Sequence, residues 1–198
     1  MRFIESILFR DGEYHNLDLH QQRLDRTFEA FMPHIASHRL ERVLPPLKME
    51  GTYKVRLVYD ADSEDADFDL EFVEYLPRKL TSLQVVHAKP FDYAFKYEDR
   101  RIIDRLTKQG TADDIIIAVD NQITDGSYFN LAFWDGENWV TPKSPLLNGV
   151  RRQQLIRDNQ LIERPIEVHD LPSFDKVSLI NAMLDLEELE VDLANVSW

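Results

Sequence analysis

Cysteine is absent from this chain of 198 residues. Without thiols the protein cannot form disulfides, thiolate zinc sites or a cysteine nucleophile, so these three kinds of chemistry are excluded. The length is sufficient for one large domain or two small ones with a substantial hydrophobic core.

Basic residues are scarce. The chain has 23 Lys and Arg against 36 Asp and Glu, which gives a formal net charge of −13. Nucleic acids and anionic membranes repel such a protein, so neither is an expected partner. If the protein binds an anion, its few basic residues must be concentrated at that site.

Long apolar runs are also missing. No stretch is long enough to span a bilayer. The first residues, MRFIE, carry an acid early and lack the apolar core of a secretory signal. The expected location is therefore the cytoplasm.

The first half of the sequence predicts a small α+β domain, residues 1–87. Alternating apolar residues indicate strands, and Asp11-Gly12 is a hairpin turn signal. A helical stripe of apolar residues begins near Leu19 and stops at Pro33, and a second helix is expected before Pro45. The expected strands cover residues 3–9, 53–59, 68–75 and 83–87, and the acidic residues 60–67 form a loop.

The second half, residues 88–198, predicts a C-terminal domain of strands with flanking helices. A helix is expected from Lys96 to Lys108, ended by Gly110, and another from Gly149 to about Asp158. The Asp135-Gly136 pair indicates a tight hairpin. The expected strands cover residues 115–119, 123–125, 130–134, 139–141, 162–169 and 177–181.

Lys96 is the most informative single residue, in the segment FKYEDRR of residues 95–101. A lysine held by a rigid element beside cations such as Arg100 can lose its proton near neutral pH, and the neutral amine is a nucleophile and a base. The other interpretation is a surface helix start in which Glu98 and Asp99 supply counter-charges.

A second candidate is the segment TDGSYFN, residues 124–130. Asp125 ends a buried strand and is followed by a glycine turn, with Asn130 starting the next strand. A buried carboxylate of this kind can hold a protonated ring nitrogen. The alternative is a turn in which Asp125 and Ser127 bond to their own backbone.

A third candidate is the segment LNGVRR, residues 147–152. A glycine at a helix N-terminus lets backbone N–H groups face an anion, and the helix dipole favours negative charge there. Phosphate is the natural ligand. The alternative is an ordinary glycine loop with exposed arginines.

A fourth candidate is the pair His20 and Arg23, one turn apart on the first helix. Arginine is well suited to bidentate binding of phosphate. The alternative is a helix-start salt bridge with Asp18. No metal site is expected: residues 60–65 lack the glycine of a calcium loop, and His34 and His38 have no Glu between them and follow Pro33, which interrupts the helical pattern.

Taken in order, the four segments resemble the class IV aminotransferase family, the fold-type IV enzymes that use pyridoxal 5′-phosphate (PLP). That family includes branched-chain and D-amino-acid aminotransferases and 4-amino-4-deoxychorismate lyase. The resemblance covers residues 3–181, nearly the whole chain. It implies a two-domain α+β fold with a small N-terminal α+β domain and a C-terminal β-barrel-like domain with flanking helices.

The resemblance also assigns roles. Lys96 matches the lysine that forms the Schiff base with the cofactor and then acts as a base. Arg100 matches an arginine four residues later, and His20 matches the histidine beside the phosphate-binding arginine. These two are the candidates for contact with substrate. The implied cofactor-binding residues are Arg23, Lys96, Asp125, Gly149, Val150, Arg151, Asn181 and Ala182.

Three departures from the family pattern are evident. Asp125 is one methylene shorter than the usual glutamate that pairs with the pyridine nitrogen. Arg151 stands where a threonine adds a hydroxyl contact, and Ala182 lacks another hydroxyl. The chain is also shorter than typical members. These differences bear on the reaction more than on the cofactor.

The resemblance therefore implies a PLP-dependent enzyme acting on a small amino or amino-carboxylate substrate. The Lys-x-x-x-Arg pattern of Lys96 and Arg100 favours a 4-amino-4-deoxychorismate lyase-like activity. The alternatives are an amino-acid aminotransferase of the branched-chain or D-amino-acid type, and a degenerate relative without catalytic activity. Members of the family are generally homodimers, so a homodimer is expected.

Overall fold

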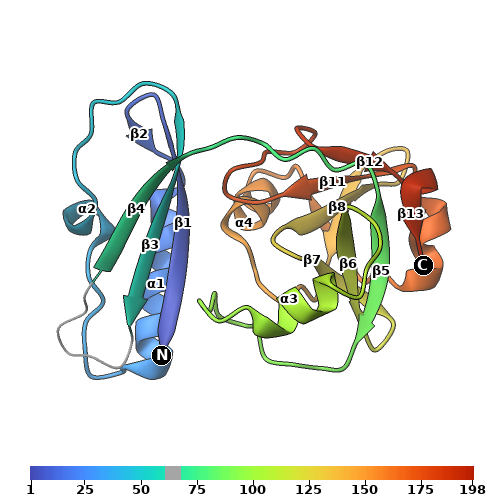
Figure 1. Cartoon of the computed structure of the whole chain (residues 1–198), viewed down its shortest axis with the longest axis horizontal. Helices are drawn as coiled ribbons and strands as arrows, with labels where there is room; N and C mark the ends of the chain where they lie inside the picture. The colour runs from blue at the N-terminus through green and yellow to red at the C-terminus, as the bar shows by residue number, and fades with distance from the viewer. Residues whose placement is uncertain (61–67) are drawn as a thin grey trace. The chain divides into compact units, whose positions relative to one another are not determined.

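The computed structural model describes residues 1–60 and 68–198 (Figure 1). Within them the chain divides into two compact units. The first contains residues 1–76 and 95–99, and the second contains residues 77–94 and 100–198. The domain boundary expected at residue 88 stays a prediction, while the compact units of the structure change over after Leu76.

The first unit is an antiparallel sheet with the strand order β2-β1-β3-β4. Helix α1 lies along one face of this sheet (Figure 1). The strands expected at residues 3–9, 53–59 and 68–75 and the two helices are confirmed, whereas the strand expected at residues 83–87 forms in the second unit. Helix α1 ends at Phe31, two residues before Pro33. The elements are β1 (Arg2–Arg10), β2 (Glu13–Tyr14), α1 (Leu17–Phe31), α2 (Leu40–Val43), β3 (Thr52–Asp60) and β4 (Phe68–Glu74).

Alternation along the strands builds the core of the first unit. Phe3, Ile7 and Phe9 of β1 are fully buried. They share a hydrophobic cluster with Leu24 and Phe28 of α1. Strand and helix periodicities thus meet on one face of the sheet, as the sequence predicts. Residues 61–67 lie outside the described residues. They include most of the expected acidic loop and of the segment that was compared with a calcium-binding loop.

The helix expected from Lys96 to Lys108 is wrong in its first part. Helix α3 covers only Arg101–Thr107, and Lys96 lies in a non-helical segment that is bridged to β1 through Phe3 and Tyr97. The ring centroid of Phe3 lies 5.3 Å from that of Tyr97 and 6.3 Å from that of Phe95. This aromatic packing and the backbone bridge to β1 prevail over the helical pattern that follows from Arg101.

The second unit contains two sheets, with strand orders β10-β9-β8-β11-β12 and β13-β5-β6-β7. Both contribute to one hydrophobic cluster, which includes Val85 and Ile116 from one sheet and Leu131 and Leu179 from the other. The elements are β5 (Leu83–Ala88), α3 (Arg101–Thr107), β6 (Asp114–Val119), β7 (Gln122–Gly126), β8 (Asn130–Trp134), β9 (Trp139–Pro142), α4 (Val150–Arg157), β10 (Ile162–Arg164), β11 (Lys176–Ile180), β12 (Glu190–Asp192) and β13 (Val196–Ser197).

One strand of the second unit is shorter than expected. The sequence predicts a strand over residues 162–169, but β10 ends at Arg164 and a 3₁₀ helix follows from Val168 to Ser173. Pro165 has no N–H to continue the ladder, and Glu167 and Asp170 form a capping box that starts the 3₁₀ helix. The α+β fold class is confirmed. None of the helices in residues 1–60 and 68–198 has the length and apolar composition needed to cross a bilayer.

Candidate active site

Lys96 occupies the centre of a tight turn. The N–H of Tyr97 donates to the carbonyl of Phe95 at 2.9 Å, which closes a γ-turn around Lys96. The N–H of Ile4 donates to the carbonyl of Lys96, and the N–H of Glu98 donates to the carbonyl of Arg2, both at 2.9 Å. The backbone on both sides of the turn is therefore fixed to β1.

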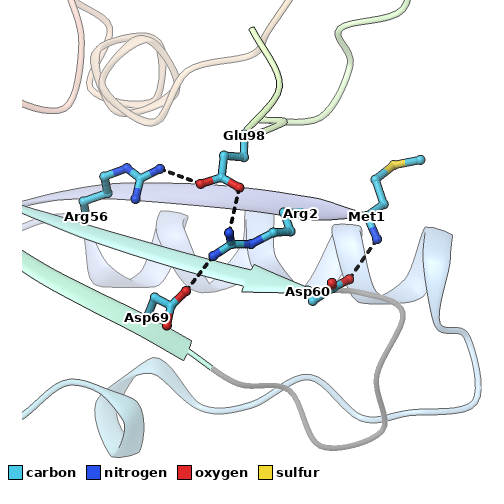
Figure 2. Close-up of polar contacts among 6 residues, drawn as sticks. All are labelled: Met1, Arg2, Arg56, Asp60, Asp69 and Glu98. Carbon is cyan, nitrogen blue, oxygen red and sulfur yellow. Dashed lines mark hydrogen bonds and ion pairs between the residues drawn. The ribbon is translucent and has the colours of Figure 1, made fainter.

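Ion pairs surround the far end of this segment (Figure 2). The Glu98 carboxylate lies 2.8 Å from Arg56 Nη2 and 3.2 Å from Arg2 Nη1. Arg2 also pairs with Asp69 of β4 at 2.5 Å. Glu98 thus joins cations from β1 and β3, two neighbouring strands.

Behind β1, a buried polar cluster joins the sheet to α1. Glu5 Oε1 accepts from Arg23 Nε at 2.8 Å, and Glu5 Oε2 accepts both from Arg23 Nη2 and from His20 Nδ1, each at 2.5 Å. Glu5 and His20 are fully buried and Arg23 is 5% exposed. Because a carboxylate only accepts, Nδ1 of neutral His20 carries the proton.

The charges in this cluster set each other's protonation. Burial alone would raise the pKa of Glu5, but the Arg23 guanidinium and the hydrogen bonds from Arg23 and His20 lower it to about 2. Burial lowers the pKa of His20 below its ordinary value, and the positive charges of Arg23 and Lys96 act in the same direction, against Glu5. His20 is therefore neutral at neutral pH, and its buried Nε2 has no hydrogen-bond partner among the described residues.

Glu5 is a residue that sequence reasoning missed. A signal for it exists, because Glu5 alternates with Phe3 and Ile7 on the core-facing side of β1. A charged residue at such a position needs a buried partner.

The second polar cluster lies in the second unit, at Asp125. Strand β7 shifts register against β6 between Ile116 and Ala118, and Asp125 falls in this irregular stretch. Its Oδ2 accepts from the N–H of Leu147 at 2.8 Å, and its Oδ1 accepts from Asn130 Nδ2 at 2.7 Å. Asn130 Nδ2 also donates to the carbonyl of Leu147 at 2.8 Å. The carboxylate thus ties β7 and β8 to the loop before α4.

Burial raises the pKa of Asp125 to about 6, although the bonds from Leu147 and Asn130 and the charge of Arg152 act against the rise. Asp125 forms no ion pair within the described part of the chain. Asp125 is consequently a buried acid that accepts hydrogen bonds from neutral N–H groups. A positive charge placed next to it would stabilise its ionised form.

Position 149 needs a glycine because no room exists for a Cβ atom, and not because of its backbone conformation. It is the N-cap of α4 with an ordinary φ of −66°, and no side chain caps the helix. A Cβ on Gly149 would lie 2.0 Å from Asn130 Oδ1. Asn130 cannot move aside without breaking its bonds to Asp125 and Leu147. The glycine therefore lets the start of α4 approach the Asp125 cluster.

The remaining expected residues contact other groups. Arg151 Nη1 donates to Gln154 Oε1 at 2.8 Å and to Asp185 Oδ2 at 3.1 Å. Asn181 Oδ1 accepts from the N–H groups of Met183 and Leu184, in the turn that contains Ala182.

Arg100 begins α3, and its Nη2 donates to the carbonyl of Ser127 at 2.7 Å. This bond connects the start of α3 to the turn that follows Asp125.

A cavity of about 420 Å³ opens beside Arg151 in the second unit. Its walls carry one cation, two carboxylates and the Trp139 ring, so it is mixed in charge. The Asp125 cluster does not line it. The lining residues are Trp139, Arg151, Gln154, Leu155, Gln160, Asp185, Leu186 and Glu187.

The structure thus gathers the expected residues in two groups, one in each unit. Lys96, His20 and Arg23 share the first unit. Asp125, Gly149, Val150, Arg151, Asn181, Ala182 and Arg100 belong to the second. His34 and His38 are exposed beyond the end of α1. No three histidine, aspartate or glutamate side chains of the described ranges could together hold a metal ion.

Known proteins resemble this chain over most of its length. It is 31% identical to an uncharacterized protein of Haemophilus influenzae, over 90% of this chain and 96% of that protein. The crystal structure of a candidate 4-amino-4-deoxychorismate lyase from Haemophilus somnus is similar with a TM-score of 0.86 and 30% identity, over 93% of this chain and 97% of that one.

A more distant structure shares the fold. The PLP-bound form of a hypothetical aminotransferase from Mycobacterium tuberculosis has a TM-score of 0.81 and 16% identity, over 98% of this chain and 80% of that one. The sequence model of amino-transferase class IV matches residues 2–186. The chain therefore belongs to the class IV aminotransferase family of enzymes.

Proposed function

We propose that this chain is a PLP-dependent enzyme in which Lys96 binds the cofactor, with a 4-amino-4-deoxychorismate lyase-like activity. The observation that carries the choice of lyase is the 30% identity to the candidate lyase of Haemophilus somnus, over 97% of that protein. Asp125, in place of the family's glutamate, is the residue on which full activity would most depend.

The residues of the second unit fit the cofactor chemically. Asp125 is a buried carboxylate without an ion-pair partner among the described residues, and a protonated ring nitrogen would supply the missing positive charge and an N–H donor. At Gly149 the first turn of α4 begins without a side-chain cap. Backbone N–H groups there, at Val150 and Arg151, suit a phosphate.

The residues of the first unit fit as well. Arg23 is held rigidly, because Glu5 accepts from two of its five N–H donors. A guanidinium oriented in this way suits phosphate binding, and Lys96 is fixed by its turn on β1. The backbone of Asn181 and Ala182 would add a further phosphate contact.

PLP supplies an electron sink for negative charge at the substrate α-carbon. The protein's own groups do the rest. Lys96 moves a proton at the α-carbon as general base. Asp125 keeps a proton on the ring nitrogen, which strengthens the sink. Arg23 in the first unit and the start of α4 in the second would each suit the phosphate.

Arg100 and His20 are the proposed substrate contacts. Arg100 is oriented by the Ser127 carbonyl at 2.7 Å, so its guanidinium is held in one direction and suits a substrate carboxylate. Neutral His20 has a buried Nε2 acceptor that suits an N–H or O–H donor.

An amino-acid aminotransferase is the second candidate. It is favoured by the shared fold of a candidate amino-acid aminotransferase from Mesorhizobium loti, with a TM-score of 0.80 over 96% of this chain and 98% of that one. A degenerate relative without activity is the third, and the replacement of glutamate by Asp125 and of hydroxyl residues by Arg151 and Ala182 supports it. We further propose a cytoplasmic homodimer acting on a small amino or amino-carboxylate substrate.

The cofactor is tested on purified protein mixed with PLP. An absorbance band that borohydride removes, together with a reduced pyridoxyl group on the peptide containing Lys96, is the expected result. The Lys96→Met variant is the control and should show neither. Intact wild-type protein that forms no such adduct with excess PLP would leave only the degenerate relative.

The reaction is tested with the adduct established. A lyase releases pyruvate from 4-amino-4-deoxychorismate without any added keto acid. An aminotransferase produces nothing until a keto acid is supplied, and then converts it to an amino acid. Pyruvate formation that depends strictly on an added acceptor would therefore overturn the choice of lyase.

A further inference from the structure

We propose that Glu98 is a positioning residue for Lys96, which it holds through two arginines of the small sheet. The inference deepens the proposed function and rests on it for the role of Lys96, but not for the geometry. Glu98 lies two residues after Lys96, and its carboxylate joins Arg56 and Arg2 (Figure 2).

The backbone of the Lys96 turn is attached to β1 over a short stretch. The turn lies in residues 95–99, which belong to the first unit, while the residues before and after them in the chain belong to the second. The segment that packs on the first unit is therefore only five residues long. A single bridge, Phe3 with Tyr97, pairs it to β1, with one hydrogen bond on each side. A strand this short is not stable from hydrogen bonds alone.

The carboxylate of Glu98 supplies a second attachment. One oxygen lies 2.8 Å from Arg56 Nη2 and the other lies 3.2 Å from Arg2 Nη1, so both are occupied by cations. The side chains of Glu98 and Arg56 are only 28% and 34% exposed, which limits screening by water. The chain has a net charge of −13, so basic residues are few, and yet two arginines pair with this one carboxylate.

Aromatic packing offers a rival explanation. Phe95 stacks edge-on against Phe31 at 4.9 Å, and Tyr97 packs on Phe3. If this packing alone fixed the turn, the Glu98 pairs would contribute as little as typical surface ion pairs do. The two explanations differ in what the removal of the Glu98 charge does to Lys96.

The experiment uses the full chain without cofactor and the variant Glu98→Gln, which keeps size and removes the charge. Amide hydrogen exchange follows the N–H of Ile4, which is bonded to the Lys96 carbonyl, and the N–H of residue 98, which is bonded to the Arg2 carbonyl. We expect protection of both to fall by about tenfold, while the N–H groups in the middle of β1 keep theirs. Competitive acetylation read by mass spectrometry should show Lys96 labelled several-fold faster.

The matched control is Asp69→Asn. It removes the partner of Arg2 on β4 and leaves both Glu98 pairs in place, so exchange at Ile4 and labelling of Lys96 should stay as in the wild type. A second variant, Arg56→Gln, should give an intermediate effect because Arg2 still pairs with Glu98.

Unchanged exchange and unchanged labelling in Glu98→Gln would overturn the proposal and favour aromatic packing. Equal effects of Glu98→Gln and Asp69→Asn would overturn it too, because the loss would then be a general loss of charge. Neither readout needs PLP. A wild-type protein that forms no PLP adduct would therefore defeat the proposed function separately.

Discussion

Two buried carboxyl groups in this molecule have pKa values that are shifted in opposite directions. Glu5 in the first unit has its pKa lowered to about 2, whereas Asp125 in the second has its pKa raised to about 6. Burial acts in the same direction on both. The difference comes from the partners, since Arg23 forms a direct ion pair with Glu5, whereas Asp125 is hydrogen-bonded by neutral N–H donors and the charge of Arg152 acts on it without an ion pair.

The comparison separates two uses of a buried acid. Glu5 is complete within its own unit, because Arg23 balances its charge and His20 adds a hydrogen bond. Asp125 holds its neighbours in place but has no ion-pair partner among the described residues. The first carboxylate orients other side chains, and the second is suited to a cationic group that comes from outside the chain.

The largest effect is expected from Glu5→Gln, which removes the charge of the carboxylate that Arg23 balances. The change leaves the Arg23 guanidinium buried without a counter-charge, and the free energy of unfolding should fall by about 3–5 kcal/mol at pH 7. Urea denaturation measures it. The loss should shrink as pH falls from about 4.5 towards 2, because the lowered pKa of Glu5 stabilises the wild type only while Glu5 is charged.

The double variant Glu5→Gln with Arg23→Met is the control. It removes both charges, so it should recover part of the stability lost in Glu5→Gln. A double variant that is less stable than Glu5→Gln alone would contradict an ion-pair origin of the low pKa.

A pH-dependent effect of the opposite sign is expected from Asp125→Asn. The pKa of Asp125 is raised from 3.8 to about 6 in the folded state, so ionising this group lowers the free energy of unfolding of the wild type. The loss is absent below pH 3.8 and complete above pH 6, where it amounts to roughly 3 kcal/mol. Near pH 4 the variant should be less stable by about 1–2 kcal/mol, because one hydrogen bond of the cluster is lost.

On raising the pH to 7 that gap should close or reverse. Urea denaturation of the cofactor-free proteins at both pH values is the measurement. A gap that does not change with pH would mean that Asp125 is not a penalised buried acid.

The same contrast explains what the sequence could predict. Asp125, Asn130 and Gly149 stand in short segments whose glycines and strand ends are visible locally, so both motifs could be identified. The position of Glu5 on the core-facing side of β1 indicates that it needs a partner, but the partners could not be predicted, because His20 and Arg23 lie 15 and 18 residues away. Only the docking of α1 on β1 brings them together.

Lys96 shows the same limit. Its identity as a candidate follows from the local sequence, but its conformation depends on Phe3, more than 90 residues earlier in the chain. The helical pattern of residues 101–107 therefore extended the expected helix too far. Contacts between distant segments fix the turn, and no local pattern contains them.

A smaller loss is expected from Gly149→Ala, which tests the rigidity of the Asp125 cluster. The new Cβ would lie 2.0 Å from Asn130 Oδ1, and the bonds of Asn130 to Asp125 and Leu147 resist a shift. The free energy of unfolding should fall by about 1–3 kcal/mol. Thermal or urea denaturation measures it.

Asn130→Ala provides the second arm of a double-mutant cycle. In an Asn130→Ala background the clash is removed, so Gly149→Ala should cost much less than it does alone. An equal cost in both backgrounds would show that the helix start, and not Asn130, rejects the methyl group.

The smallest effect is expected from His20→Phe. The change deletes one hydrogen bond to Glu5, which costs about 1 kcal/mol, but it also removes a buried Nε2 acceptor that has no partner among the described residues. These terms oppose each other, so stability at pH 7 should stay within about 1 kcal/mol of the wild type.

The effect of His20→Phe should appear in acid instead. Without the His20 donor the pKa of Glu5 rises from about 2, so the stability that charged Glu5 provides is lost at a higher pH. Urea denaturation from pH 7 to pH 3 measures this shift, and a loss above 3 kcal/mol at pH 7 would make His20, and not Arg23, the main partner of Glu5.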